Sequence, residues 1–262
     1  MKEVENIYLI KLFCNPIKAK ALFIILMLLT QVIYSQNNRK SFTKADTLRG
    51  TITPEREWWD VLRYDIIIEP EFESKTIIGS NTIRYKTVKE NHPLVMQIDL
   101  QEPLKIDSII LNNQKRLSYN REGNAWFVET ENSSLNSINE VTIYYKGKPR
   151  EAIRAPWDGG WTFTKDSLGR PWMTVTSQGL GASVWYPNKD HQSDEPNDGA
   201  SLTMIVPNNL VAVANGKLQE KMPVSNDKTS YTWAVENPIN NYNIIPYIGN
   251  YVNFSEKFLG LK

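Results

Sequence analysis

The chain has 262 residues, of which 41% are hydrophobic and 11% are aromatic, enough to bury a sizeable core in one large domain or two small ones. Thirty basic and twenty-nine acidic residues nearly cancel, so there is no broad basic surface to neutralise phosphates or an anionic bilayer. The composition therefore indicates a globular protein and argues against nucleic acid as a partner.

Residues 1–36 have the pattern of an export signal. Lys11, Lys18 and Lys20 precede the apolar run 21–29, and residues 34–36 offer a cleavage point. Because this run is much shorter than the roughly 20 residues of a membrane-spanning helix, we favour a cleaved signal over an anchor. We expect export to the periplasm or the extracellular space, without membrane contact after cleavage. The only cysteine, Cys14, lies in this segment, so the mature chain is expected to have no disulfide and no thiol nucleophile.

Residues 37–52 are polar and lack periodicity, which predicts a flexible leader. The folded domain is expected from residue 53 to residue 256. It contains many short runs of β-branched and alternating apolar residues that are separated by turn residues. The predicted strands are 64–69, 76–88, 94–100, 106–111, 125–129, 140–145, 172–176, 201–206, 210–214, 230–235 and 244–251.

No stretch after residue 37 shows helical periodicity over three turns. Strand follows strand through both halves of the chain, without an internal repeat. The sequence therefore predicts an all-β fold, a large antiparallel sandwich or saddle.

Most catalytic motifs are missing from this sequence. A zinc protease helix needs two histidines four residues apart with a glutamate between them, but the chain has only His92 and His191. A zinc site within the chain is therefore not expected, and we predict no catalytic residues and no metal ligands. Phosphate-binding loops and the G-x-S-x-G nucleophile motif are also missing.

One polar cluster deserves comparison with a catalytic triad. Asp190, His191, Asp194 and Glu195 lie beside two serines, Ser183 and Ser193. Neighbours on one loop seldom face one another as a triad requires. We therefore favour a structural role in loop hydrogen bonds and ion pairs over catalysis.

Four tryptophans suggest a different function. Trp157, Trp161, Trp172 and Trp185 could line a platform on which sugar rings stack, since aromatic faces bury apolar area. Tryptophan is also an ordinary residue of β cores. Packing is favoured here, and carbohydrate binding remains an alternative.

Several motifs, in this order, carry a resemblance to a known family. They are W-W-D-V-L-R-Y-D-I-I-I-E-P at 58–70, S-Q-G-L-G-A-S-V-W-Y-P-N-K-D-H-Q-S-D-E-P at 177–196, P-N-N-L-V-A-V-A-N-G-K-L at 207–218, and E-N-P-I-N-N-Y-N-I-I-P-Y-I-G-N-Y at 236–251. Together they resemble the N-terminal domain of the M1 zinc aminopeptidases, the aminopeptidase N and leukotriene A4 hydrolase group, in a Bacteroidetes-type form. The resemblance covers nearly the whole mature chain.

The resemblance implies a β-saddle that lies over a zinc-containing catalytic domain. It places Gln178 where the family has the glutamine or glutamate that binds the free α-amine of a peptide substrate. An amide oxygen can accept a hydrogen bond from an ammonium group. The competing interpretation is a turn glutamine beside Gly179.

The sequence departs from the family in lacking H-E-x-x-H and G-x-M-E-N. Because Zn²⁺ supplies the main rate acceleration in such enzymes, we expect this chain to be inactive alone, with residues 257–262 as the truncated start of a link to a missing catalytic domain. The partners implied are that domain and the N-terminus of a peptide. A stand-alone peptide- or protein-binding module is the other alternative.

Overall fold

The computed structural model describes residues 17, 20, 21, 23–25, 27, 41–256 and 260. The chain divides into two compact units, Met1–Thr43 and Lys44–Lys262. In the first unit the described residues before 41 are helical. Most of the predicted signal and the start of the predicted leader lie outside the described residues. Of the predicted link, only residue 260 is described.

The second unit consists mainly of strands. Its helical elements are short: α3 (Lys44–Gly50), α4 (Pro54–Glu57) and the 3₁₀ turns η1 (Ala182–Val184) and η2 (Asn241–Asn243). The strands are β1 (Trp59–Glu71), β2 (Thr76–Thr87), β3 (Val95–Asp99), β4 (Lys105–Leu111), β5 (Lys115–Arg116), β6 (Tyr119–Glu122), β7 (Ala125–Glu129), β8 (Ile138–Gly147), β9 (Gly160–Lys165), β10 (Pro171–Thr176), β11 (Ala200–Pro207), β12 (Val211–Val213), β13 (Lys217–Pro223), β14 (Lys228–Val235) and β15 (Tyr247–Gly249).

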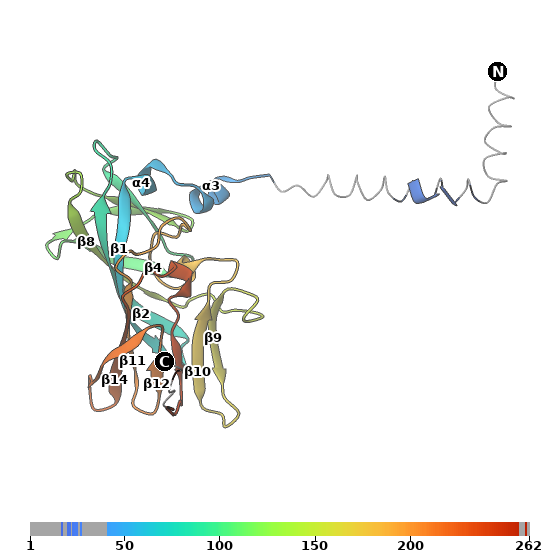
Figure 1. The fold of residues 1–262 in the computed structure, drawn as a ribbon, viewed down its shortest axis with the longest axis vertical. Helices are drawn as coiled ribbons and strands as arrows, with labels where there is room; N and C mark the ends of the chain where they lie inside the picture. The colour runs from blue at the N-terminus through green and yellow to red at the C-terminus, as the bar shows by residue number, and fades with distance from the viewer. Residues whose placement is uncertain are drawn as a thin grey trace, which may run out of the picture. The chain divides into compact units, whose positions relative to one another are not determined.

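Three sheets make up this unit (Figure 1). The largest has eight strands in the order β13-β14-β11-β1-β2-β8-β4-β5, and the others have the orders β12-β15-β10-β9 and β3-β7-β6. The prediction of an all-β fold is confirmed. Most strand pairs are antiparallel as expected, and one pair, β1 and β11, runs in parallel. More than a hundred residues separate these strands, so the chain has room to return in the same direction.

Strand β1 shows why these residues form a sheet. Tyr64, Ile66 and Ile68 are buried, whereas Ile67 between them is half exposed, which is the period-2 pattern of a strand with one face on the core. On the neighbouring strand a Cβ atom at Gly79 would lie 2.5 Å from the carbonyl oxygen of Ile67. Glycine at this position therefore lets β1 and β2 approach each other.

All the strands predicted from alternation are present, and β5, β6, β9 and β13 are additional. Residues 44–50 of the predicted leader form α3, none of whose residues is buried. The core is one continuous apolar cluster that joins the sheets and includes Trp58, Trp59, Trp161 and Trp185. Helix α4 lies next to Trp58 and Trp59 of this cluster, and the segment after β10 contributes Trp185 to it. The candidate site lies between α4 and that segment.

Candidate functional site

Gln178 lies in a tight loop that follows β10. The carbonyl oxygen of Ser177 accepts hydrogen bonds from the backbone N–H of Leu180 at 3.0 Å and of Gly181 at 2.8 Å. Gly179 has φ of +70°, which glycine adopts without strain. Gln178 is exposed in this loop, so its side-chain amide is accessible to a ligand.

The next turn, η1, is fixed by a carboxylate. Asp190 accepts hydrogen bonds from the backbone N–H of Ala182 (3.3 Å) and from the N–H and hydroxyl of Ser183 (3.0 and 2.6 Å). Gly181, at φ of +85°, leaves room for this contact, because a Cβ atom there would lie 2.3 Å from the Asp190 carboxylate. Asp190 therefore holds the loop that follows Gln178.

A buried ion pair lies behind Asp190. Arg56 Nη2 is 2.6 Å from Asp99 Oδ2, and both side chains are more than nine-tenths buried. The backbone N–H of Asp190 donates to the same Asp99 oxygen at 3.0 Å, and Gln97 donates to the other oxygen at 3.0 Å. Burial raises the pKa of the Asp99 carboxyl, and the Arg56 guanidinium opposes that rise. Asp99 thus links α4 to the loop that contains Asp190.

A second buried pair fastens the same loop to β1. Lys189 and Asp194 form an ion pair with almost no solvent exposure. The Lys189 ammonium also donates to the carbonyl oxygen of Trp59 at 2.5 Å and lies 4.7 Å from the centre of that ring. Asp194 accepts from the backbone N–H of Val61 at 3.2 Å. Burial lowers the pKa of Lys189, and the neighbouring carboxylate offsets part of that effect.

The polar cluster does not form a triad. Ser183 donates its hydroxyl proton to Asp190 rather than to a histidine. His191 Nδ1 accepts the backbone N–H of Ser193 at 3.2 Å and lies 2.8 Å from the hydroxyl oxygen of the same residue. Among the described residues no hydrogen bond joins this ring to a carboxylate that would orient it as a base.

The environment of the imidazole also opposes its charged form. Burial, followed by the charge of Arg56, lowers the pKa of His191. The other member of the cluster, Glu195, is exposed. The geometry therefore supports the structural role that the sequence favoured for this cluster.

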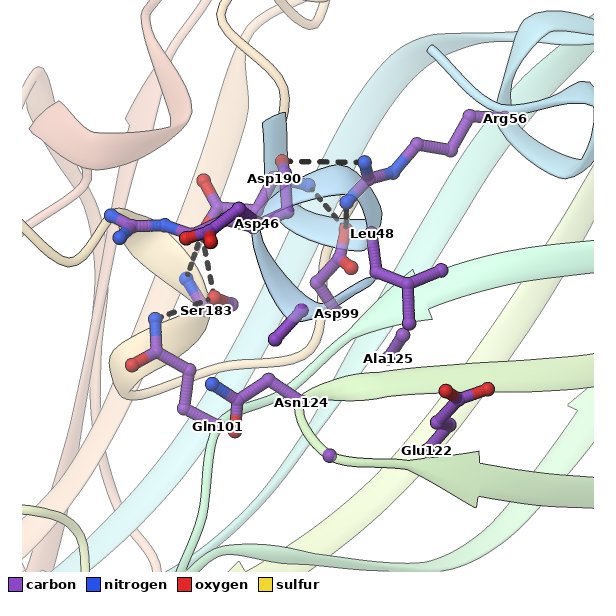
Figure 2. A pocket seen from close by; sticks show the side chains of 13 residues that line it. Asp46, Leu48, Arg56, Asp99, Gln101, Glu122, Asn124, Ala125, Ser183 and Asp190 are labelled. Atoms are coloured by element: carbon purple, nitrogen blue, oxygen red, sulfur yellow. Dashed lines mark hydrogen bonds and ion pairs between the residues drawn. The ribbon is translucent and has the colours of Figure 1, made fainter. Parts of the chain in front are cut away.

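A pocket of about 390 Å³ lies beside these residues (Figure 2). It is lined by residues of α3, the Arg56 and Asp99 pair, the β6 to β7 turn and η1. Gln101, on its wall, donates to the carbonyl oxygen of Leu180 at 2.7 Å and to the Ser183 hydroxyl at 2.9 Å. Its amide group thus supports the Gln178 loop from the pocket side.

The four tryptophans do not share one exposed face. Trp161 and Trp185 are completely buried, and their rings pack edge to face with centroids 6.3 Å apart. Trp172 is partly buried and donates to the Tyr251 hydroxyl at 2.6 Å. Only Trp157 of the four, with 73% exposure, is open to solvent. The four tryptophans therefore do not form one platform for sugar stacking, because Trp161 and Trp185 belong to the core.

The histidines do not fit a zinc site. His92 stacks on Trp58 with ring centroids 4.0 Å apart, and its Nε2 accepts the backbone N–H of Ser133 at 3.3 Å. His191 is engaged as described above. In residues 41–256 and the few described before them, no group of three or more His, Cys, Asp or Glu side chains is placed to hold a metal ion. The donor set of the described chain thus does not suit zinc.

The role of Gln178 stays a prediction from the motif resemblance, and sequence reasoning missed the residues that support its loop. Arg49 and Arg56 lie before β1, Asp99 and Gln101 lie at and just after the end of β3, and none of the four belongs to a motif. The one local signal is the glycine on each side of Leu180, since glycines at such spacing indicate a turn with positive φ.

No protein-family model matches the sequence, and neither does any curated protein. Among solved structures, an M1 zinc metallopeptidase from Deinococcus radiodurans has a similar fold, with a TM-score of 0.63 and 19% identity over 74% of this chain and 43% of that chain. A mutant of that enzyme, crystallised with a Tyr-Ser-Ala substrate, matches with a TM-score of 0.63 and 18% identity over the same shares of the two chains. Yeast LTA4 hydrolase matches with a TM-score of 0.58 and 18% identity, over 74% of this chain and 29% of that chain.

At these identities the likeness establishes the fold. The second unit has the fold of the N-terminal β domain of M1 zinc metallopeptidases, as the motif resemblance implied. The chain spans less than half the length of the structures that it matches. Within the part of the chain that the structure describes, no helix has the length and apolar character needed to cross a membrane.

Proposed function

We propose that this chain is the substrate-recognising N-terminal domain of an exported M1-type zinc aminopeptidase, and that Gln178 binds the free α-amine of the peptide. The observation that carries the proposal is the exposed amide of Gln178, on a braced loop, in a fold shared with M1 zinc metallopeptidases. The amide oxygen accepts a hydrogen bond from the ammonium group of the substrate.

Two features of the loop suit this role. The turn from Ser177 to Gly181 is closed by two backbone hydrogen bonds, and its far end is capped by Asp190. A receptor group on such a loop loses little conformational entropy when it binds, so more of the hydrogen-bond energy appears as affinity. One neighbour was crystallised with Tyr-Ser-Ala, a peptide with a free amine, which makes this tripeptide a suitable probe.

The hydrolytic step belongs to a catalytic domain. This sequence has no H-E-x-x-H motif, so the zinc ion and the general base would come from that domain, where the metal polarises the scissile carbonyl and activates water. We propose that the chain by itself does not hydrolyse peptides. Its contribution is to select a peptide N-terminus, and the signal-like residues 1–36 direct it out of the cytoplasm.

The test is a titration of the chain with Tyr-Ser-Ala and with N-acetyl-Tyr-Ser-Ala. A hydrogen bond to a charged group is worth about 1.5–3 kcal/mol, so the free peptide should bind roughly 10- to 150-fold more tightly than the acetylated one. Gln178→Ala should remove this preference. Gln178→Glu should retain it, because a carboxylate also accepts from an ammonium group.

A matched control is Gln219→Ala, which alters an exposed glutamine on the edge strand β13, remote from the loop in sequence. This variant should keep the preference for the free amine. Equal binding of the two peptides to the unmodified chain would overturn the proposal, and so would full retention of the preference in Gln178→Ala.

A further inference from the structure

The side chain of Arg49 joins helix α3 to the Gln178 loop. Arg49 Nη2 donates a hydrogen bond to the carbonyl oxygen of Gly179 at 2.6 Å, although 130 residues separate the two in sequence. Gly179 is the residue after Gln178. The contact therefore acts on the backbone immediately beside the receptor amide.

The loop needs such an anchor. Gln178 and Gly179 are both exposed, and glycine gives the backbone more freedom than any other residue. The next carbonyl along the loop, that of Leu180, is held at 2.7 Å by Gln101. On its other side the backbone of Gln178 lies against Gly159, where an added Cβ atom would be only 2.7 Å from the Gln178 carbonyl oxygen. Together these contacts restrain the loop from three directions.

Arg49 is itself connected to the buried core. Arg56 Nη1 donates to the Arg49 carbonyl oxygen at 3.3 Å and to the Thr51 carbonyl oxygen at 2.9 Å. The second terminal nitrogen of Arg56, Nη2, is paired with Asp99. The backbone of Arg49 is thus held by a residue of the buried ion pair, and the side chain of Arg49 is held by its hydrogen bond to Gly179.

Polar contacts hold the rest of α3 as well. No residue of α3 is buried, and Gln97 donates to the Leu48 carbonyl oxygen at 2.9 Å. Lys44 forms an exposed ion pair with Glu122. Since the helix buries no apolar side chain, little hydrophobic stabilisation depends on it. Its contacts concentrate instead on the pocket and the loop.

We propose that Arg49 is a positioning residue for the amine site: through Gly179 it holds Gln178 in the orientation that receives the ammonium group. This inference rests on the proposed function, and it adds helix α3 to the recognition apparatus. The charge of the guanidinium strengthens its hydrogen bond to the carbonyl, so a short chain segment on the surface can order the loop.

The experiment compares Arg49→Ala, Arg49→Lys and the control Lys44→Ala, which breaks an exposed ion pair on the same helix. Two quantities are measured on each protein. One is the ¹⁵N relaxation of the backbone amides of residues 178–180, which reports motion on the picosecond to nanosecond scale. The other is the ratio of affinities for Tyr-Ser-Ala and its N-acetyl form.

Arg49→Ala should make these amides mobile and lower the affinity ratio about fivefold, the factor that one net hydrogen bond contributes. Arg49→Lys should restore most of the ratio, and Lys44→Ala should change neither quantity. All three variants should melt at the temperature of the unmodified chain, because the altered side chains are exposed.

The outcomes separate this inference from the proposal on which it rests. If the unmodified chain shows no preference for the free amine, both fail. If it shows the preference and Arg49→Ala keeps it, with or without a more mobile loop, only the positioning role of Arg49 is overturned. A loss of preference together with rigid amides at 178–180 also refutes that role, since the loop would not have moved.

Discussion

Replacing Asp99 with asparagine should strongly destabilise the domain. The substitution keeps the shape of the side chain but leaves the charge of Arg56 buried, with a side-chain exposure of 0%, opposite a neutral group. Breaking a buried ion pair from one side costs about 3–5 kcal/mol. The new amide nitrogen also competes with the Gln97 N–H, which now donates to the carboxylate at 3.0 Å.

That loss is large beside the whole stability of a domain, which is about 5–15 kcal/mol. Urea denaturation followed by tryptophan fluorescence measures it, since the core contains buried tryptophans. The matched control is Asp107→Asn, which breaks a pair with Lys146 whose side chains are 44% and 57% exposed. An exposed pair of this kind contributes only about 0–1 kcal/mol.

A double variant tests the reasoning from the other side. Arg56→Met with Asp99→Leu removes both charges, so it should be less destabilising than Asp99→Asn alone, because no buried charge is left without a partner. If Asp99→Asn costs no more than Asp107→Asn, or if the double variant is the less stable of the two, the role assigned to this pair is refuted.

Three further predictions concern the site and its surroundings. Trp157→Ala should change the free energy of unfolding by less than about 0.5 kcal/mol, whereas Trp161→Ala should lower it by about 3–5 kcal/mol. The reason is that the Trp157 ring is 73% exposed and the Trp161 ring is fully buried. Equal losses for the two variants in urea titrations would contradict this prediction. Gly181→Ala should cost about 1–3 kcal/mol of strain and displace Asp190, which a Cβ atom would approach to 2.3 Å, and an unchanged unfolding midpoint would show that the turn is relaxed. Folding lowers the pKa of His191, so the neutral imidazole contributes to stability above its unfolded pKa of about 6.5, and this contribution is lost as pH falls through the folded pKa. His191→Gln should therefore flatten the fall of the melting temperature on acidification. An identical pH profile in the variant would show that His191 does not cause that fall.

The strands could be predicted from sequence wherever one face is buried. In β1 the apolar residues alternate in and out of the core, and the same pattern marks β2 and β11. Strand β13 has no such signal, because all seven of its residues are exposed at the edge of the sheet. Helix α3 was missed for the same reason, since it buries no residue and shows no apolar periodicity.

The site could be predicted only in part. The motif that suggests Gln178 as a site residue is contiguous in sequence, and the role of that residue stays a prediction. The residues that support its loop could not be predicted, because a charged residue such as Arg56 or Asp99 is expected at the surface. Their burial depends on a contact between residues 43 positions apart, and the contact of Arg49 with Gly179 spans 130 positions. Tertiary pairing of this kind leaves no local pattern.

The most direct test of the account is the resonance of the Gln178 side-chain amide during titration with Tyr-Ser-Ala. The account predicts that this amide shifts in a saturable way with the free peptide and does not shift with the N-acetyl peptide at the same concentrations. An amide that stays unmoved by the free peptide, or that shifts equally with both, would contradict it.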